Sequence, residues 1–176
     1  AKLDGTAVDN FLTPTALPVA VSSLTLVYDP PEGSNVRLFD VSDQWEIGFC
    51  EWTTDNDAAY KYLYWDGEAF TKRDMIATGA VFGYDPEVHY HGGMAFPRPA
   101  TGGVVYLTRE DSDVWYLEKW TTEDGGANWT TTEIASSDSK LIRPACVMGG
   151  GGVIVRLATT YAGYTSFTGD TLLYED

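Results

Sequence analysis

Residues 113–136 read DVWYLEKWTTEDGGANWTTTEIAS, and this stretch decides the fold. Aromatic residues and threonine, which suit the pleated surface of a strand, lie on both sides of a central Asp-Gly-Gly. Glycine supplies the positive φ that a tight turn needs, and an aspartate side chain can accept backbone N–H bonds across the turn. The stretch therefore predicts two antiparallel strands joined by a turn, with the Asp124 carboxylate bridging the turn and the Trp129 ring covering its outside.

The same plan recurs along the chain. Asp66-Gly67 leads to Phe70 much as Asp124 and its two glycines lead to Trp129. Three apolar segments, each opened by a cationic or titratable side chain, begin units that repeat about every 50 residues. These opening segments are NVRLFDVS at 35–42, HYHGGMAF at 89–96 and LIRPACVM at 141–148.

Further strand-like segments follow each opening segment. The first unit continues with WEIGFCEW, AYKYLYWDG and AFTKRDMIA, and the second with GGVVYLTRE, DVWYLEKWTTEDGG and NWTTTEIAS. The third unit continues with GGVIVRLATTY and GYTSFTGDTLLYED, and it is shorter. Four antiparallel strands in about 50 residues is the plan of a β-propeller blade. We therefore predict an all-β chain with about three blades.

This repeat divides the chain into four parts. Residues 1–29 form an N-terminal extension or the outer strand of a preceding blade, 30–82 and 83–137 each form a blade, and 138–176 form an incomplete last blade. Closed propellers have at least about four blades, so the sequence predicts a partial propeller or a subunit of a larger ring. The missing blades would come from other copies of the chain or from the rest of a longer chain.

The charge balance limits the choice of partner. The chain of 176 residues has 26 acidic and 11 basic residues and a formal net charge of -15 at pH 7. Nucleic-acid binding needs a basic face, so we expect no nucleic-acid partner. No segment has the composition of a membrane span or a targeting leader, and we expect neither. Cys50 and Cys146 lack the spacing of a zinc knuckle or a redox motif, and we expect buried, reduced thiols.

The opening segments also carry the candidate site residues. The first strand of a propeller blade lies closest to the central axis, so we expect Arg37, His89 or His91, and Arg143 to gather around one pocket. Surface or inter-blade ion pairs are the alternative for each arginine. The pair Gly92-Gly93 would let another backbone or a ligand approach closely, or would form a bulge.

The two histidines are the only ones in the chain. In a strand, His89 and His91 face the same side, and Tyr90 faces the other. Three interpretations remain open at this point: a polysaccharide site, a structural histidine pair, and a zinc site completed by Cys50 or Cys146. The sequence identifies no cofactor.

The quoted segments, taken in order, resemble a known family. VRLFDVS, YKYLYWDGEAF, HYHGGMAF, VVYLTRE, WYLEKWTTEDGGANW, IRPACV and TYAGYTSFTGDT resemble the last blades of secreted BNR-repeat (sialidase-like) propellers, a group that includes ulvan-type polysaccharide lyases. TTEDGGANW is similar to their Asp-box, with Thr122 as the hydroxyl residue before the aspartate, and YWDGEAF is a degenerate copy. The resemblance extends over roughly residues 30–170.

The resemblance implies a specific chemistry. A lyase that acts on a uronic-acid polymer must neutralise the sugar carboxylate, remove the adjacent proton and protonate the leaving oxygen. Arginine suits the first task because its planar guanidinium pairs with a carboxylate through two hydrogen bonds. Histidine can act as the base and tyrosine as the acid. The matching residues here are His89 or His91 as base, Tyr90 or Tyr161 as acid, and Arg143, together with Arg37, for substrate binding.

The functional expectation is therefore a carbohydrate-active propeller portion, extracellular or surface-exposed, that acts on an anionic polysaccharide by lyase-like β-elimination. The alternative is a non-catalytic glycan-binding or structural module of a larger assembly, such as a virion tail or fibre. A sialidase is less well supported, because nothing in the spacing of Tyr161 and Glu87 selects them as a catalytic pair.

Overall fold

The computed structural model describes most of the chain from residue 27 onward. Its described backbone comprises residues 7–8, 14–15, 27–53, 58–79, 82–85, 88–90, 92–148, 152–162 and 166–175, and its described side chains are those of 27–53, 58–79, 92–148, 152–155 and 169–175. These residues contain strands and turns but no helix, and hence no helix that could cross a membrane. The predicted all-β fold is confirmed.

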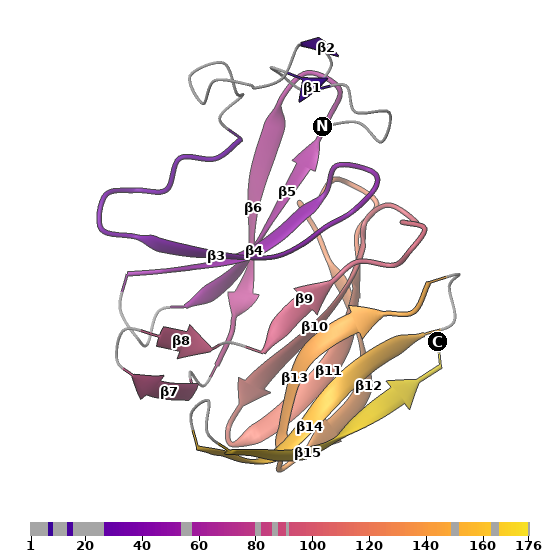
Figure 1. The fold of residues 1–176 in the computed structure, drawn as a ribbon. Coiled ribbons are helices and arrows are strands. Elements are labelled where there is room, and N and C mark those ends of the chain that lie inside the picture. Colours follow the sequence, from indigo (N-terminus) through magenta and orange to yellow (C-terminus); the bar gives the residue numbers. More distant parts are fainter. Residues whose placement is uncertain are drawn as a thin grey trace.

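Three antiparallel sheets make up the body of the molecule (Figure 1). The first sheet has the order β3 (Asn35–Val41), β4 (Ile47–Trp52), β5 (Ala59–Trp65) and β6 (Phe70–Ala77). The second contains β9 (Gly93–Ala95), β10 (Val104–Asp111), β11 (Val114–Thr121) and β12 (Thr130–Ser137). The third contains β13 (Lys140–Cys146), β14 (Val153–Ala162) and β15 (Ser166–Tyr174).

Each sheet is a meander in which consecutive strands are neighbours, as expected for a blade. Among the described residues, the third sheet has three strands. The first strands of the three sheets, β3, β9 and β13, contact one another in that order. The described sheets therefore form blade-like units that do not close into a ring.

Two pairs of short strands lie outside these sheets. One pair is β1 (Ala7–Val8) with β2 (Pro14–Thr15), and the other is β7 (Phe82–Asp85) with β8 (Val88–Tyr90). The outer strand expected within residues 1–29 falls almost entirely outside the described residues.

The hydrophobic core is divided between the two sheet interfaces. Alternate residues of a strand point to opposite faces, so each sheet contributes one face to each neighbour. The cluster between the first and second sheets comprises Cys50, Tyr60, Tyr62, Met94, Phe96, Val105, Leu107 and Trp120. The cluster between the second and third sheets comprises Tyr106, Trp115, Leu117, Leu141, Ile142, Val153 and Val155. The middle sheet is therefore apolar on both faces.

The turn between β11 and β12 forms largely as the sequence predicts. The Asp124 carboxylate accepts hydrogen bonds from the Asn128 backbone N–H at 2.9 Å and from the Thr122 hydroxyl at 2.8 Å. Bonds from the side chain and backbone of Asn128 lower the pKa of Asp124 to about 2. The Asp66 carboxylate of the β5–β6 turn accepts two backbone N–H bonds at 2.8 Å.

The prediction that Trp129 covers the outside of its turn is wrong. The Trp129 ring is half-buried between sheets, with its centroid 5.1 Å from that of Tyr62 and 6.1 Å from that of Trp120. Gly126 makes this possible, since its backbone has a φ of 81° and packs directly against Tyr62 and Trp129. The ring gains more buried apolar surface in the interface than it would over an exposed turn.

The single strand predicted over residues 89–96 is also wrong, because the structure has two short strands there. β8 pairs with β7, whereas β9 begins at Gly93 and pairs with β10. Gly93 has a φ of 130°, which interrupts an extended strand. His89 and Tyr90 therefore lie in a separate hairpin, just before the first strand of the second sheet.

Candidate functional site

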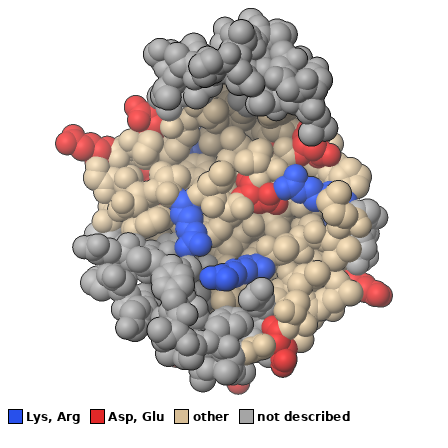
Figure 2. Space-filling model, viewed as in Figure 1, with Lys and Arg blue, Asp and Glu red and all other residues tan. Residues whose placement is uncertain are grey.

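A cavity of about 220 Å³ lies where the first strands of the three sheets meet. Its lining is Arg37, Leu38 and Phe39 of β3, Gly92, Gly93 and Met94 at the start of β9, and Arg143 and Pro144 of β13. The structure thus brings two arginines from different sheets to one hollow, more than one hundred residues apart in the chain. Figure 2 shows basic side chains near the centre of one face of the molecule, with most of the acidic side chains toward its edge.

Arg143 reaches the cavity from an unusual backbone conformation. Its φ is 54°, in the left-handed region that a non-glycine residue rarely adopts. The pairing of β13 with β14 shifts register between Ile142 and Ala145, which is a β-bulge, and bulges re-aim side chains. The Arg143 backbone N–H donates to the Gly92 carbonyl at 2.8 Å. This bond and the bulge fix an exposed arginine side chain beside β9.

The two glycines of the cavity wall allow the strands to approach one another. A Cβ atom at Gly92 would lie 2.1 Å from the carbonyl oxygen of Thr108, far inside van der Waals contact. A Cβ atom at Gly93 would lie 2.9 Å from Cδ of Pro144. Close approach of another backbone, one of the two interpretations open from the sequence, therefore explains the Gly92-Gly93 pair.

A buried tyrosine hydroxyl ties the cavity wall to the first sheet. The Tyr60 hydroxyl donates to the Thr108 carbonyl at 2.6 Å and accepts from the Gly93 backbone N–H at 2.7 Å. Tyr60 is fully buried, and burial raises the pKa of its hydroxyl far above the usual range. Tyr60 is therefore a neutral structural bridge between the first and second sheets.

Arg37 is half-buried on β3, opposite Cys50 of β4. Its guanidinium carbon lies 5.8 Å from the centroid of the Phe39 ring. Burial raises the pKa of the Cys50 thiol to about 12, although the charge of Arg37 opposes this shift. Cys50 is therefore a protonated core thiol at neutral pH. Neither Cys50 nor Cys146 forms a disulfide, and Cys146 is only partly buried.

The remaining predicted site residues have side chains outside the described part of the structure. His89 and Tyr90 are described only as backbone in β8, Tyr161 only as backbone in β14, and His91 lies outside the described residues. His91 directly precedes Gly92 of the cavity wall in the chain. Among the side chains that the structure describes, no group of histidine, cysteine, aspartate and glutamate could hold a metal ion.

Two other arginines make ion pairs between or within sheets. Arg98 donates to the Asp40 carboxylate across the first sheet interface, and Asp40 also accepts from the Phe96 backbone N–H at 2.9 Å. The Arg109 guanidinium donates to both carboxylate oxygens of Glu118, at 3.0 Å and 2.9 Å. These two arginines fit the ion-pair alternative.

A second polar cluster, around Glu46, was not predicted from the sequence. The Glu46 carboxylate is buried and accepts from the hydroxyls of Ser42 and Tyr62, at 2.8 Å and 2.7 Å, and from the Gly103 backbone N–H at 2.6 Å. It borders a hollow of about 440 Å³ between the first two sheets. Because Glu46 is one of 26 acidic residues, no sequence signal singled it out. Its three donors make it a structural link between the sheets.

No family of known proteins, no characterised protein and no solved structure matched the chain. The cavity is therefore interpreted from its own geometry. Two arginines line the cavity at a junction of three strands, and this arrangement suits an anionic ligand.

Proposed function

We propose that the chain is a carbohydrate-active β-propeller portion that binds an extracellular anionic polysaccharide at the cavity between β3, β9 and β13. The observation that carries this proposal is the shared cavity of Arg37 and Arg143, which come from different sheets. An isolated guanidinium at a surface needs no special backbone, whereas Arg143 is held at a φ of 54° by a bulge. Such a conformation costs about 1–3 kcal/mol and is concentrated at functional sites.

The negative charge of the molecule restricts where an anionic polymer can bind. A net charge of -15 repels a free polyanion unless cations are gathered in one place. Two arginines at one hollow meet this requirement, and each can form paired hydrogen bonds with a sugar carboxylate. The volume of about 220 Å³ is below that of a pocket enclosing a drug-sized ligand, about 300–1,000 Å³. It suits one sugar ring of a polymer that continues outside the cavity.

The proposed reaction is lyase-like β-elimination, in line with the resemblance to ulvan-type lyases. Arg143 and Arg37 bind the uronate carboxylate and so stabilise the negative charge that develops when the neighbouring carbon loses its proton. His89 or His91 accepts that proton. The bond to the leaving glycosidic oxygen then breaks, a carbon–carbon double bond forms, and Tyr90 or Tyr161 protonates the oxygen.

The arginine pair is tested by substitution and polyuronate binding. Arg143→Ala removes one of the two cations, so we expect polyuronate affinity to fall about tenfold or more at low salt, which corresponds to one charge-assisted hydrogen-bonded contact. Arg143→Lys keeps the charge but loses the planar fork, and an intermediate affinity is expected. Lys61→Ala is the control, because it removes one positive charge at a residue paired with Asp74 on the outer side of the first sheet. Equal losses in Arg143→Ala and Lys61→Ala would contradict the proposal.

The second candidate function is a non-catalytic glycan-binding or structural module of a larger assembly. The absence of ring closure among the described sheets favours it. His91→Ala separates the two functions. Loss of unsaturated-uronate formation in a folded variant supports the lyase, whereas glycan binding by the wild type without any turnover supports the module.

A further inference from the structure

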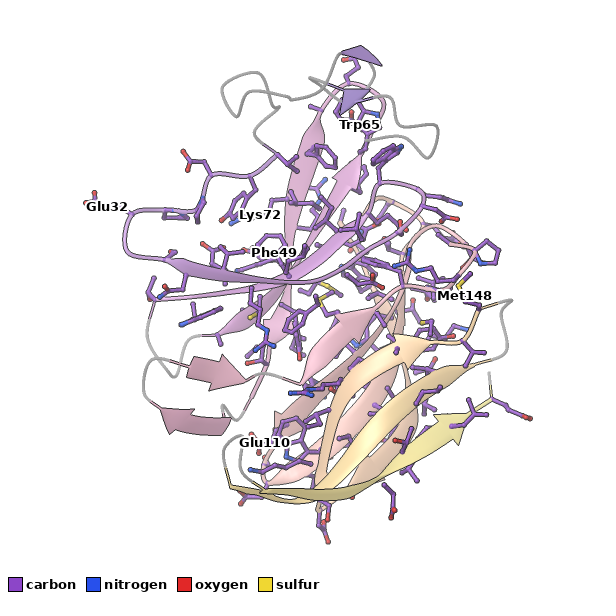
Figure 3. The ribbon with its side chains drawn as sticks, viewed as in Figure 1. Glu32, Phe49, Trp65, Lys72, Glu110 and Met148 are labelled. Carbon is purple, nitrogen blue, oxygen red and sulfur yellow. The ribbon has the colours of Figure 1, made fainter. Side chains whose placement is uncertain are left out.

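The outer face of the first sheet is apolar over β3 and β4, carries the ion pairs of Lys61 and Lys72 over β5 and β6, and has no sheet packed against it among the described residues (Figure 3). We call this surface the open face. It contains a hollow of about 270 Å³ lined by Val27, Tyr28, Pro30, Val36, Leu38, Ile47, Phe49 and Leu63. Val36 is 41% and Leu38 59% exposed. An exposed patch of this kind is typical of an interaction surface.

The chain itself covers only part of the open face. The Tyr28 ring packs on Phe49, with the centroids 5.2 Å apart, and its hydroxyl donates to the Glu51 carboxylate at 2.9 Å. Lys72 also bonds to the Tyr28 hydroxyl and to Glu51. Phe49 is thereby buried, whereas the β3 side of the hollow remains exposed.

The corresponding faces of the other two sheets show what fits such a surface. On the second sheet, the equivalent face of β9, β10 and β11 presents Met94, Leu107 and Trp120 and is covered by the first sheet. On the third sheet, Val153 and Val155 of β14 are covered by the second sheet. In both cases the occupant is the opposite face of another sheet of this chain. The open face therefore continues an interface that the molecule already forms twice.

The opposite end of the sheet stack presents a matching surface. Ala145, Ile154 and Leu173 are direct cross-strand partners on β13, β14 and β15, so their side chains share one face of the third sheet. Val153, Val155 and Leu172 face the second sheet, so this row faces away from it. Ala145 is exposed and Leu173 is 57% exposed. We call this surface the end face.

We propose that the open face of one copy of the chain packs against the end face of a second copy. When a contact joins two different surfaces, it repeats from copy to copy, and the copies form a closed ring only at one particular number of copies. Propellers have typically about four to eight blades, and with the three blade-like sheets that the structure describes in each chain, two copies fall within that range. The assembly is therefore a closed head-to-tail dimer with two equivalent contacts, in which the partner also completes the wall around the Arg37 and Arg143 cavity.

Salt strengthens this dimer. Each copy has a net charge of -15, so the two copies repel each other at low ionic strength, and salt screens this repulsion. The apolar contact itself is not weakened by screening. A dimer held by ion pairs would show the opposite dependence.

The first test is the solution mass of the purified chain by sedimentation in low and in high salt. We expect twice 19.3 kDa, with the dimer fraction rising with salt. Leu38→Glu on the open face and Leu173→Glu on the end face should each weaken the dimer about tenfold or more, since both bury a charge in an apolar contact. Met148→Glu is the matched control, because Met148 is 79% exposed on a loop outside both faces (Figure 3).

Mixing the two variants distinguishes a head-to-tail contact from a symmetric one. A mixed dimer of Leu38→Glu and Leu173→Glu has one intact contact, whereas each variant alone has none. We therefore expect dimers in the mixture at concentrations where each variant alone is monomeric. A monomeric wild type at both salt concentrations, an open polymer, or a dimer that survives both substitutions would each overturn the proposal, with folding checked by near-ultraviolet circular dichroism.

Discussion

At the scale of single residues, a few buried polar groups hold the sheets in register. The Tyr60 hydroxyl bonds to the Thr108 carbonyl and to the Gly93 N–H in a site without solvent access. Glu46 makes a similar link near the other end of the same interface, through the Tyr62 hydroxyl and the Gly103 N–H. Apolar packing alone would tolerate sliding of one sheet over the other, whereas these directional bonds specify one alignment.

Tyr60→Phe tests this role. The substitution keeps the ring but leaves the Thr108 carbonyl and the Gly93 N–H without their partner, so we expect a loss of about 1–3 kcal/mol in the free energy of unfolding. Urea denaturation measures it. Tyr64→Phe is the control, since among the described residues no hydrogen bond involves the Tyr64 hydroxyl, and its effect should stay within about 0.5 kcal/mol. Equal effects of the two substitutions would contradict a bridging role for Tyr60.

At the scale of elements, the spacing of β9 from its neighbours depends on glycine. Gly92 meets the Thr108 backbone, and Gly93 meets Pro144, so the wall of the arginine cavity has no room for side chains there. The close approach also positions the Gly92 carbonyl that accepts from Arg143. The geometry of the cavity is thus a consequence of strand packing around two small residues.

Gly92→Ala separates this steric requirement from ordinary backbone preference. Its Cβ would lie 2.1 Å from the Thr108 oxygen, so β9 must move away from β10, and we expect a loss of more than about 2 kcal/mol in stability. Gly67→Ala is the comparison, because Gly67 has a φ of 106° but nothing within 4 Å of a Cβ. That change should cost only about 1 kcal/mol, from the backbone conformation. Thermal unfolding of both variants gives the comparison, and a smaller effect at Gly92 than at Gly67 would refute the steric explanation.

The sequence predicted the strands well because their signals are local. Ten of the strand segments expected from apolar patterns and turn residues correspond to strands of the three sheets, and the Asp124 turn forms as expected. The prediction of a single strand over residues 89–96 was wrong because the sequence pattern shows apolar character but not the backbone conformation of Gly93. The predicted position of Trp129 was wrong for a different reason, since the position of its ring depends on the neighbouring Tyr62, which lies on another sheet.

The candidate site was predictable only in part. Arg37 and Arg143 were singled out because each opens a repeat unit, and the structure brings both to one cavity. The roles of His89, His91, Tyr90 and Tyr161 stay predictions, since their side chains lie outside the described residues. The bulge at Arg143 and the buried position of Glu46 depend on long-range packing, which no local pattern encodes.

At the scale of the whole molecule, the excess of negative charge acts on both folding and association. The compact state concentrates a net charge of -15 and is destabilised by self-repulsion, which salt screens over distances of about 10 Å at 0.1 M. We therefore expect the melting temperature to rise as sodium chloride is increased at pH 7. Dimer formation would raise it as well, because association stabilises the folded state.

The Leu38→Glu variant separates these two contributions. In this variant the screening effect on the fold remains, whereas the contribution of the dimer is lost. The melting temperature of the wild type should therefore depend on both salt and protein concentration, and that of the variant on salt alone. Scanning calorimetry at two protein concentrations measures both dependences. A wild-type melting temperature that does not change with salt would show that charge repulsion is not a significant term in the stability of this acidic chain, and one that falls with salt would show that its surface ion pairs, such as Lys61 with Asp74, outweigh the repulsion.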